Sequence, residues 1–81
     1  MKERIEKKLR DALKPRLLEV INNSALHIGH LGDDGSGETH FTIIIDADEL
    51  KIGKVQAHRK INSLLKEEFN KGLHALEIKV I

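Results

Sequence analysis

The apolar pattern from Glu38 to Asp46 constrains the fold more than any other part of the sequence. Phe41, Ile43 and Ile45 occur at every second position of this segment. A two-residue apolar period built from β-branched and aromatic side chains is typical of a β-strand with one buried face. A single strand cannot bury that face, so the chain must supply further strands and a covering layer.

Four other segments can supply these partners. Residues 2–14 and 55–70 carry apolar side chains at helical spacing with charged residues on the other face, which predicts two amphipathic helices. Residues 16–22 and 74–81 are rich in apolar residues over strand-like lengths and predict two more strands. Pro15 ends the first helix because the residue before a proline avoids the helical region.

These elements predict an α+β fold in which two helices cover one face of a three-stranded sheet. Residues 25–37 hold four of the six glycines and predict a long loop between the first two strands, and residues 47–53 predict a polar turn with a short helical piece. We expect one domain over residues 1–81, because the chain is short and has no linker or repeat. The predicted apolar stripe of the second long helix consists of Val55, His58, Ile61, Leu64, Leu65 and Phe69.

The composition favours a binding module over an enzyme. The chain has five histidines and no cysteine, which excludes a disulfide scaffold and a thiol nucleophile. It also cannot supply the thiolates that an iron–sulfur cluster usually needs. The carboxylate pairs Asp33-Asp34 and Glu67-Glu68 are adjacent in sequence, so we expect the two side chains of each pair to point in different directions. No nucleophile, base and orienting group can be assembled. We therefore expect no catalytic residues.

Charge and hydropathy limit the partners and the location. The net charge of +1 and the presence of only two aromatic residues argue against an extended nucleic-acid surface. The charged N-terminus is unlike a signal peptide, and no apolar run has the length of a membrane span. We expect a cytoplasmic protein, or one of the mitochondrial matrix in a eukaryote, with no membrane partner.

The histidines are the side chains best suited to bind a metal, because imidazole is the commonest metal ligand. His27 and His30 lie three residues apart on the Gly-rich loop, but two ligands do not make a closed zinc site, and both are alternatively solvated loop residues. His74 opens the last strand, where a backbone partner is the alternative. We expect His40 to be half exposed in its strand and His58 to pack against or cap its helix.

A basic cluster surrounds the start of the second long helix and predicts contact with nucleic-acid phosphates. The alternative is a solvated face with nearby acids such as Glu67 and Glu68. The cluster consists of Lys51, Lys54, His58, Arg59 and Lys60.

A series of short motifs runs through almost the whole chain in a fixed order. They are Arg4-Ile5-x-x-Lys8-Leu9, Leu18-Glu19-Val20, Asn22-x-Ser24, His27, Glu38-Thr39-His40-Phe41, His58-Arg59 and His74-Ala75-Leu76. Together they resemble the BolA family. The resemblance implies the order α-β-β-α-α-β and a class II KH-like arrangement, and it makes the turn near Gly53 a short helix.

The resemblance also implies a function and a partner. BolA-like proteins bind monothiol glutaredoxins and share a bridging [2Fe-2S] cluster with the glutaredoxin cysteine and glutathione, in iron–sulfur assembly, trafficking or iron regulation. His74 matches the C-terminal ligand of the family, and His27 best matches the loop ligand, with His30 as the alternate. The implied cofactor belongs to the complex, and none is expected in the isolated chain.

The same resemblance offers a second function, that of a DNA-binding transcriptional regulator. This chain departs from the family in the region credited with DNA contact: Leu50 stands where a Phe is usual, Ala57 replaces an Arg, and one residue is missing. DNA binding is therefore the alternative, and a weak homodimer is a further possible association. The residues that would contact DNA are Lys54, His58, Arg59 and Lys60.

Overall fold

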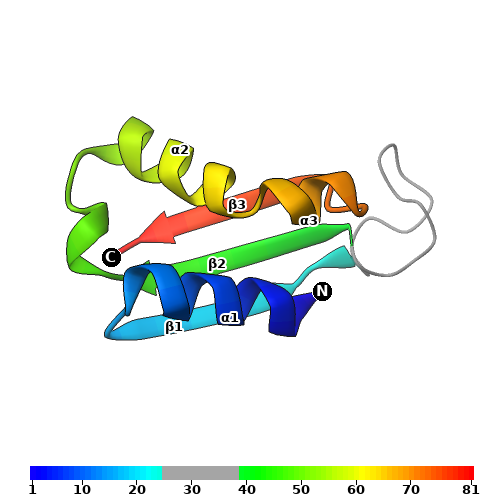
Figure 1. The fold of residues 1–81 in the computed structure, drawn as a ribbon, viewed down its shortest axis with the longest axis horizontal. Coiled ribbons are helices and arrows are strands. Elements are labelled where there is room, and N and C mark those ends of the chain that lie inside the picture. The colour runs from blue at the N-terminus through cyan, green and yellow to red at the C-terminus, as the bar shows by residue number, and fades with distance from the viewer. Residues whose placement is uncertain (25–38) are drawn as a thin grey trace.

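The computed structural model describes residues 1–24 and 39–81, whose arrangement is shown in Figure 1. The elements follow in the order α1 (Lys2–Leu13), β1 (Leu17–Asn22), β2 (His40–Asp46), the 3-10 helix η2 (Asp48–Leu50), α2 (Lys54–Leu64), α3 (Lys66–Asn70) and β3 (Ala75–Val80). This order confirms the α+β fold that the sequence predicts. The short helix expected in the turn over residues 47–53 is η2.

The central strand of the sheet is β2, because the strand order is β1-β2-β3. β1 pairs with β2 in the antiparallel direction, with Val20 opposite Ile43. β3 pairs with β2 in the parallel direction, with Ile78 opposite the same Ile43. Parallel neighbours need a crossover connection, which α2 and α3 provide. The N-terminal ends of β2 and β3 therefore lie at the same end of the sheet as the C-terminal end of β1.

The core lies between the sheet and the helices, which occupy one side of the sheet in Figure 1. On β2, Phe41, Ile43 and Ile45 are at most 2% exposed, as their two-residue period predicts. The helices contribute a stripe of aliphatic side chains with helical spacing. These residues are Ile5, Leu9 and Leu13 of α1, Ala57 and Ile61 of α2, and Leu65 after it.

The helical segment predicted over residues 55–70 is not one helix, and that prediction is wrong in detail. It divides at Leu65 into α2 and α3. The amide of Leu65 donates to the carbonyl of Ile61 over 3.1 Å, and the amide of Phe69 donates to the carbonyl of Leu65 over 3.1 Å. Helical hydrogen bonds therefore continue on both sides of the division. Leu65, the residue between the two helices, is fully buried, so the junction lies in the core.

The predicted apolar stripe of this segment is wrong at its first residue. Val55 is 62% exposed, whereas Ala57 and Ile61 are buried. Residues four apart share one face of a helix, so a buried face that contains positions 57, 61 and 65 turns position 55 toward solvent. Glu68, which lies near the end of the same face, is also completely buried.

Two turns set the direction of the chain where helices end. Lys14 has a φ of 45°, and its left-handed conformation ends α1 directly before Pro15. Gly72 has a φ of 116° in the turn between α3 and β3. A side chain at this φ is strained, so glycine permits the turn that brings the chain into β3.

The described helices are short. The longest, α1, has 12 residues, whereas a bilayer-spanning helix needs about 20 apolar ones. No helix within residues 1–24 and 39–81 is long and apolar enough to cross a membrane.

Candidate functional site

Two histidines meet at the end of the sheet where β2 and β3 begin. His40 is paired with Ala75 in the parallel register, so His74, the residue before β3, lies beside it. The centroids of the two imidazole rings are 5.5 Å apart, and the ring planes are inclined by 52°. The structure therefore brings together two of the histidines that the sequence singles out.

The backbone around these histidines is fixed by Thr39 and Ser24. The carbonyl of Thr39 accepts hydrogen bonds from the amide of His74 over 2.8 Å and from the amide of Ala75 over 3.1 Å. The hydroxyl of Ser24, which is 2% exposed, accepts from the amides of Thr39 over 2.8 Å and His40 over 3.0 Å. Hydrogen bonds thus anchor the start of β3 and the start of β2 to the same small group of residues.

The two imidazoles differ in their access to solvent. His74 is exposed, whereas His40 is only 7% exposed, so the expectation of a half-exposed His40 is wrong. Contacts of its ring with the ring of His74 and with the hydroxyl of Thr39 contribute to this burial. Nδ1 of His40 lies 2.8 Å from the hydroxyl oxygen of Thr39, which gives the buried ring a polar partner.

The donor set at this end can contribute to a metal site but does not complete one. A neutral imidazole nitrogen is a good ligand for zinc, copper, nickel or iron, and His74 offers one at the surface. Within the described residues, no group of three or more histidine, cysteine, aspartate or glutamate side chains could hold a metal ion. His27 and His30, the predicted loop ligands, lie outside the described residues.

The predicted nucleic-acid residues lie on α2, which begins at Lys54. Lys54, Arg59 and Lys60 are exposed, and His58 is half-buried. Lys60 forms an ion pair with Glu49 over 3.4 Å. Among the residues that the structure describes, no carboxylate forms an ion pair with Lys54 or Arg59.

A pocket of about 470 Å³ lies beside this helix start. Lys54 and His58 of α2 line it together with Lys79 of β3, and its apolar walls include Leu50 and Ile78. Lys54 gives this side of the molecule an unpaired positive charge among the described residues, whereas Lys79 forms an ion pair with Glu77 over 3.3 Å.

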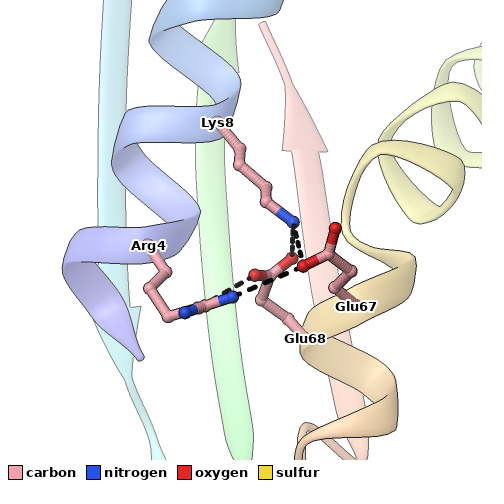
Figure 2. A network of polar contacts seen from close by, with 4 residues as sticks. All are labelled: Arg4, Lys8, Glu67 and Glu68. Atoms are coloured by element: carbon pink, nitrogen blue, oxygen red, sulfur yellow. Dashed lines mark hydrogen bonds and ion pairs between the residues drawn. The ribbon is translucent and has the colours of Figure 1, made fainter.

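The two acids expected near this basic cluster, Glu67 and Glu68, have other partners, so that detail of the alternative is wrong, although Lys60 does have an acidic neighbour in Glu49. Glu67 and Glu68 on α3 face Arg4 and Lys8 of α1 (Figure 2). The fully buried carboxylate of Glu68 accepts hydrogen bonds from Nζ of Lys8 over 2.8 Å and from Nε of Arg4 over 3.1 Å. Glu67 is 69% exposed and makes longer ion pairs of 3.6 and 3.7 Å with the same cations. The expectation that these adjacent carboxylates point in different directions is therefore wrong, because Arg4 and Lys8 draw both toward α1.

The ionisation of Glu68 follows from these contacts. Burial is the largest single influence and raises the pKa of the carboxyl group, but the hydrogen bonds from Lys8 and Arg4, a backbone hydrogen bond and the charge of Lys8 together outweigh it. The net result is a pKa below the ordinary value of 4.5, so Glu68 is ionised at neutral pH. This network joins α1 to α3 and is part of the scaffold behind the site.

Two residues that shape the site, Ser24 and Thr39, lie within the BolA-like motifs, but no role at the site is predicted for either from the sequence. The turn-forming residues Asn22-Asn23-Ser24 were a usable signal, because a serine after asparagines commonly bonds nearby backbone. Its contact with Thr39 depends on residues that are distant in sequence, and no local pattern could indicate it.

Comparison with known proteins identifies the family. A sequence model of the family described as BolA-like protein matches residues 9–81. The chain belongs to the BolA-like family. Its motif resemblance to BolA proteins is thereby confirmed.

Related proteins and solved structures agree with this membership in the BolA-like family. The chain is 49% identical over 78 residues to a Sinorhizobium protein of the cobS 5' region, covering 94% of this chain and 84% of that one. It is 40% identical over 75 residues to the "DNA-binding transcriptional regulator BolA" of Haemophilus influenzae, covering 91% and 69%. The structure of the BolA domain of SufE1 from Arabidopsis thaliana superposes with a TM-score of 0.88 at 41% identity, covering 98% of this chain and 87% of that one.

Proposed function

We propose that this BolA-like chain is an adaptor that binds a monothiol glutaredoxin and helps coordinate a bridging [2Fe-2S] cluster in iron–sulfur assembly, trafficking or iron regulation. His74 would supply one iron ligand, and His27, or alternatively His30, would supply the second. The observation that carries the proposal is the exposed imidazole of His74 on a backbone anchored to Thr39 over 2.8 Å. No catalytic step is assigned to the chain.

The chemistry of the donors supports a shared site. Iron–sulfur clusters are held mainly by cysteine thiolates, and imidazoles can replace the thiolates on one iron. This chain has five histidines and no cysteine, so it could provide the imidazole side only. The thiolates would come from the glutaredoxin cysteine and from glutathione. The cluster would therefore belong to the complex and would be absent from the isolated chain.

The position of His74 is also suited to a partner interface. It follows the Gly72 turn and precedes β3, so a rigid strand holds its backbone while its side chain faces solvent. A docking protein can reach such a side chain without opening the core. A ligand built on a strand end is also held more precisely than one on a free loop.

The direct test is a titration of the chain into cluster-loaded monothiol glutaredoxin, followed by visible absorption and circular dichroism. We expect the spectrum of the glutaredoxin homodimer to be replaced by that of a heterocomplex with mixed ligands. A spectrum that stays that of the homodimer at excess chain would refute the proposal.

The ligand assignment needs matched variants. His74→Ala should weaken the heterocomplex spectrum strongly, whereas His58→Ala removes a half-buried imidazole of α2 and should leave it unchanged. Equal effects would remove His74 from the site. His27→Ala and His30→Ala, measured in the same way, decide which of the two loop histidines is the second ligand.

A DNA-binding regulator is the second candidate function. The side chains of Lys54 and Arg59 are exposed, and the Haemophilus relative carries the name of a DNA-binding regulator. Each phosphate contact makes the fall of log affinity with log salt concentration steeper by about 0.9. Fluorescence anisotropy with duplex DNA should then show a salt slope that Lys54→Ala or Arg59→Ala reduces. Sequence-independent binding that vanishes near physiological salt would refute this candidate.

A further inference from the structure

The buried imidazole of His40 has no part in the function proposed above. It is 7% exposed, and its Nδ1 lies 2.8 Å from the hydroxyl of Thr39. Burial limits the rotamers of the ring, and the hydroxyl partner limits its rotation. His40 is therefore a fixed surface next to the exposed imidazole of His74, whose ring centroid is 5.5 Å away.

His74 has a fixed backbone but an exposed side chain. Its amide is bound to the carbonyl of Thr39 over 2.8 Å, which leaves the rotation about its side-chain bonds as its main freedom. Aromatic rings with centroids 4.5–7 Å apart and tilted planes attract each other. The separation of 5.5 Å and the inclination of 52° between His40 and His74 fall within this favourable geometry.

We propose that His40 is a positioning residue for His74, and that it holds the His74 imidazole in the rotamer from which it binds metal. Thr39 links the two histidines, because its hydroxyl contacts the ring of His40 and its carbonyl binds the amide of His74. The metal in question rests on the proposed function, whereas the positioning is a property of the isolated chain and can be measured there.

The alternative is that His40 is itself a metal ligand. Its burial and the contact of Nδ1 with Thr39 argue against this, because a shared metal needs an accessible nitrogen. His74 has that access and His40 does not. The two roles predict different results for a phenylalanine at position 40, which keeps the ring and removes both nitrogens.

The test uses the isolated, isotope-labelled chain and measures the vicinal couplings that report the side-chain rotamers of His74. We expect one dominant rotamer in the parent chain and in His40→Phe, and averaging over several in His40→Ala. The contact between the two rings should favour the dominant His74 rotamer over the others by roughly two- to tenfold. Amide spectra verify that each variant is folded, and His58→Ala serves as the control that removes a distant imidazole.

A second measurement uses the same variants in the titration with cluster-loaded monothiol glutaredoxin. His40→Ala should weaken the heterocomplex about two- to tenfold, less than His74→Ala does, and His40→Phe should restore it. Loss of the heterocomplex spectrum with both His40→Ala and His40→Phe would identify His40 as a ligand and overturn its positioning role.

The two proposals fail in different ways. Unchanged His74 couplings in folded His40→Ala would refute the positioning, whatever the titration shows. An unchanged glutaredoxin spectrum with the parent chain would refute the proposed function, while the couplings would still decide whether His40 fixes the rotamer of His74.

Discussion

Replacing Glu68 by glutamine tests the strongest polar link in the scaffold. The Glu68 carboxylate is fully buried and accepts hydrogen bonds of 2.8 Å from Lys8 and 3.1 Å from Arg4. Glutamine has nearly the same volume but no charge, and its amide group turns donors toward one of the two cations. The substitution therefore removes charge-assisted contacts without opening a cavity.

The magnitude follows from the burial of the three groups. A hydrogen bond to a charged group contributes about 1.5–3 kcal/mol. Lys8 and Arg4 keep 31% and 45% of their side chains exposed, so water can resolvate them in the variant. We therefore expect Glu68→Gln to cost about 2 kcal/mol, the value of roughly one such bond and not two. For a domain of this size that lowers Tm by roughly 8–16 °C.

The assay is urea unfolding at neutral pH, followed by far-ultraviolet circular dichroism, with Glu67→Gln as the matched control. Glu67 neighbours Glu68 and faces the same cations, but it is 69% exposed and its ion pairs are 3.6 and 3.7 Å long. An exposed pair of this kind contributes less than about 1 kcal/mol. Equal losses in the two variants would show that burial of Glu68 does not determine the strength of the contact.

Three further predictions concern the pH dependence of stability and substitutions of Ser24 and Gly72. The pKa of Glu68 is lower in the folded state than its ordinary value of 4.5, so its contribution to stability is complete above that value and is lost as the pH falls through the folded pKa. As the pH is lowered, the free energy of unfolding should thus fall less steeply for Glu68→Gln than for the parent chain. Parallel curves for the two proteins would contradict this. Ser24→Ala leaves the buried amides of Thr39 and His40 without their acceptor and should cost about 1–3 kcal/mol by thermal unfolding, whereas exposed Ser63→Ala should not destabilise. Gly72→Ala places a side chain at a φ of 116° and should cost about 1–3 kcal/mol, and an unchanged Tm would refute the strain.

The sequence predicts the elements well because their apolar periods are local. The alternation of Phe41, Ile43 and Ile45 is enough to place the central strand, and Pro15 is enough to end α1. The division of residues 55–70 at Leu65 is not visible in the same way, because the apolar spacing continues through the break. Leu65 at the break is fully buried in the core, and local spacing does not reveal such tertiary packing.

The candidate site was predictable in part for the same reason. His74 is identified by its motif, and the parallel register then places it beside His40. The burial of His40 and the role of Thr39 depend on contacts between the beginnings of β2 and β3, where the paired residues His40 and Ala75 are 35 positions apart in sequence. Glu68 illustrates the same limit, since a glutamate next to Glu67 gives no local sign that it is buried.

The scaffold and the candidate site are joined through Glu68, which leads to a last prediction. While its carboxylate is bound to α1, its main-chain carbonyl accepts hydrogen bonds of 3.0 Å from the amides of Lys71 and Leu73, directly before His74. Loss of the carboxylate should free α3 from α1 and loosen this turn as well as destabilise the whole fold.

Hydrogen exchange separates these two effects. A purely global loss lowers the protection of all core amides by one common factor, whereas local opening adds to it at particular amides. In Glu68→Gln we expect the amides of Leu73 and His74 to lose more protection than that of Ile43 in the central strand, and Glu67→Gln should show no such difference. An equal loss at all three amides would mean that the turn carrying His74 is held by the sheet alone, through the carbonyl of Thr39, and that the charge network stabilises the fold without influencing the site.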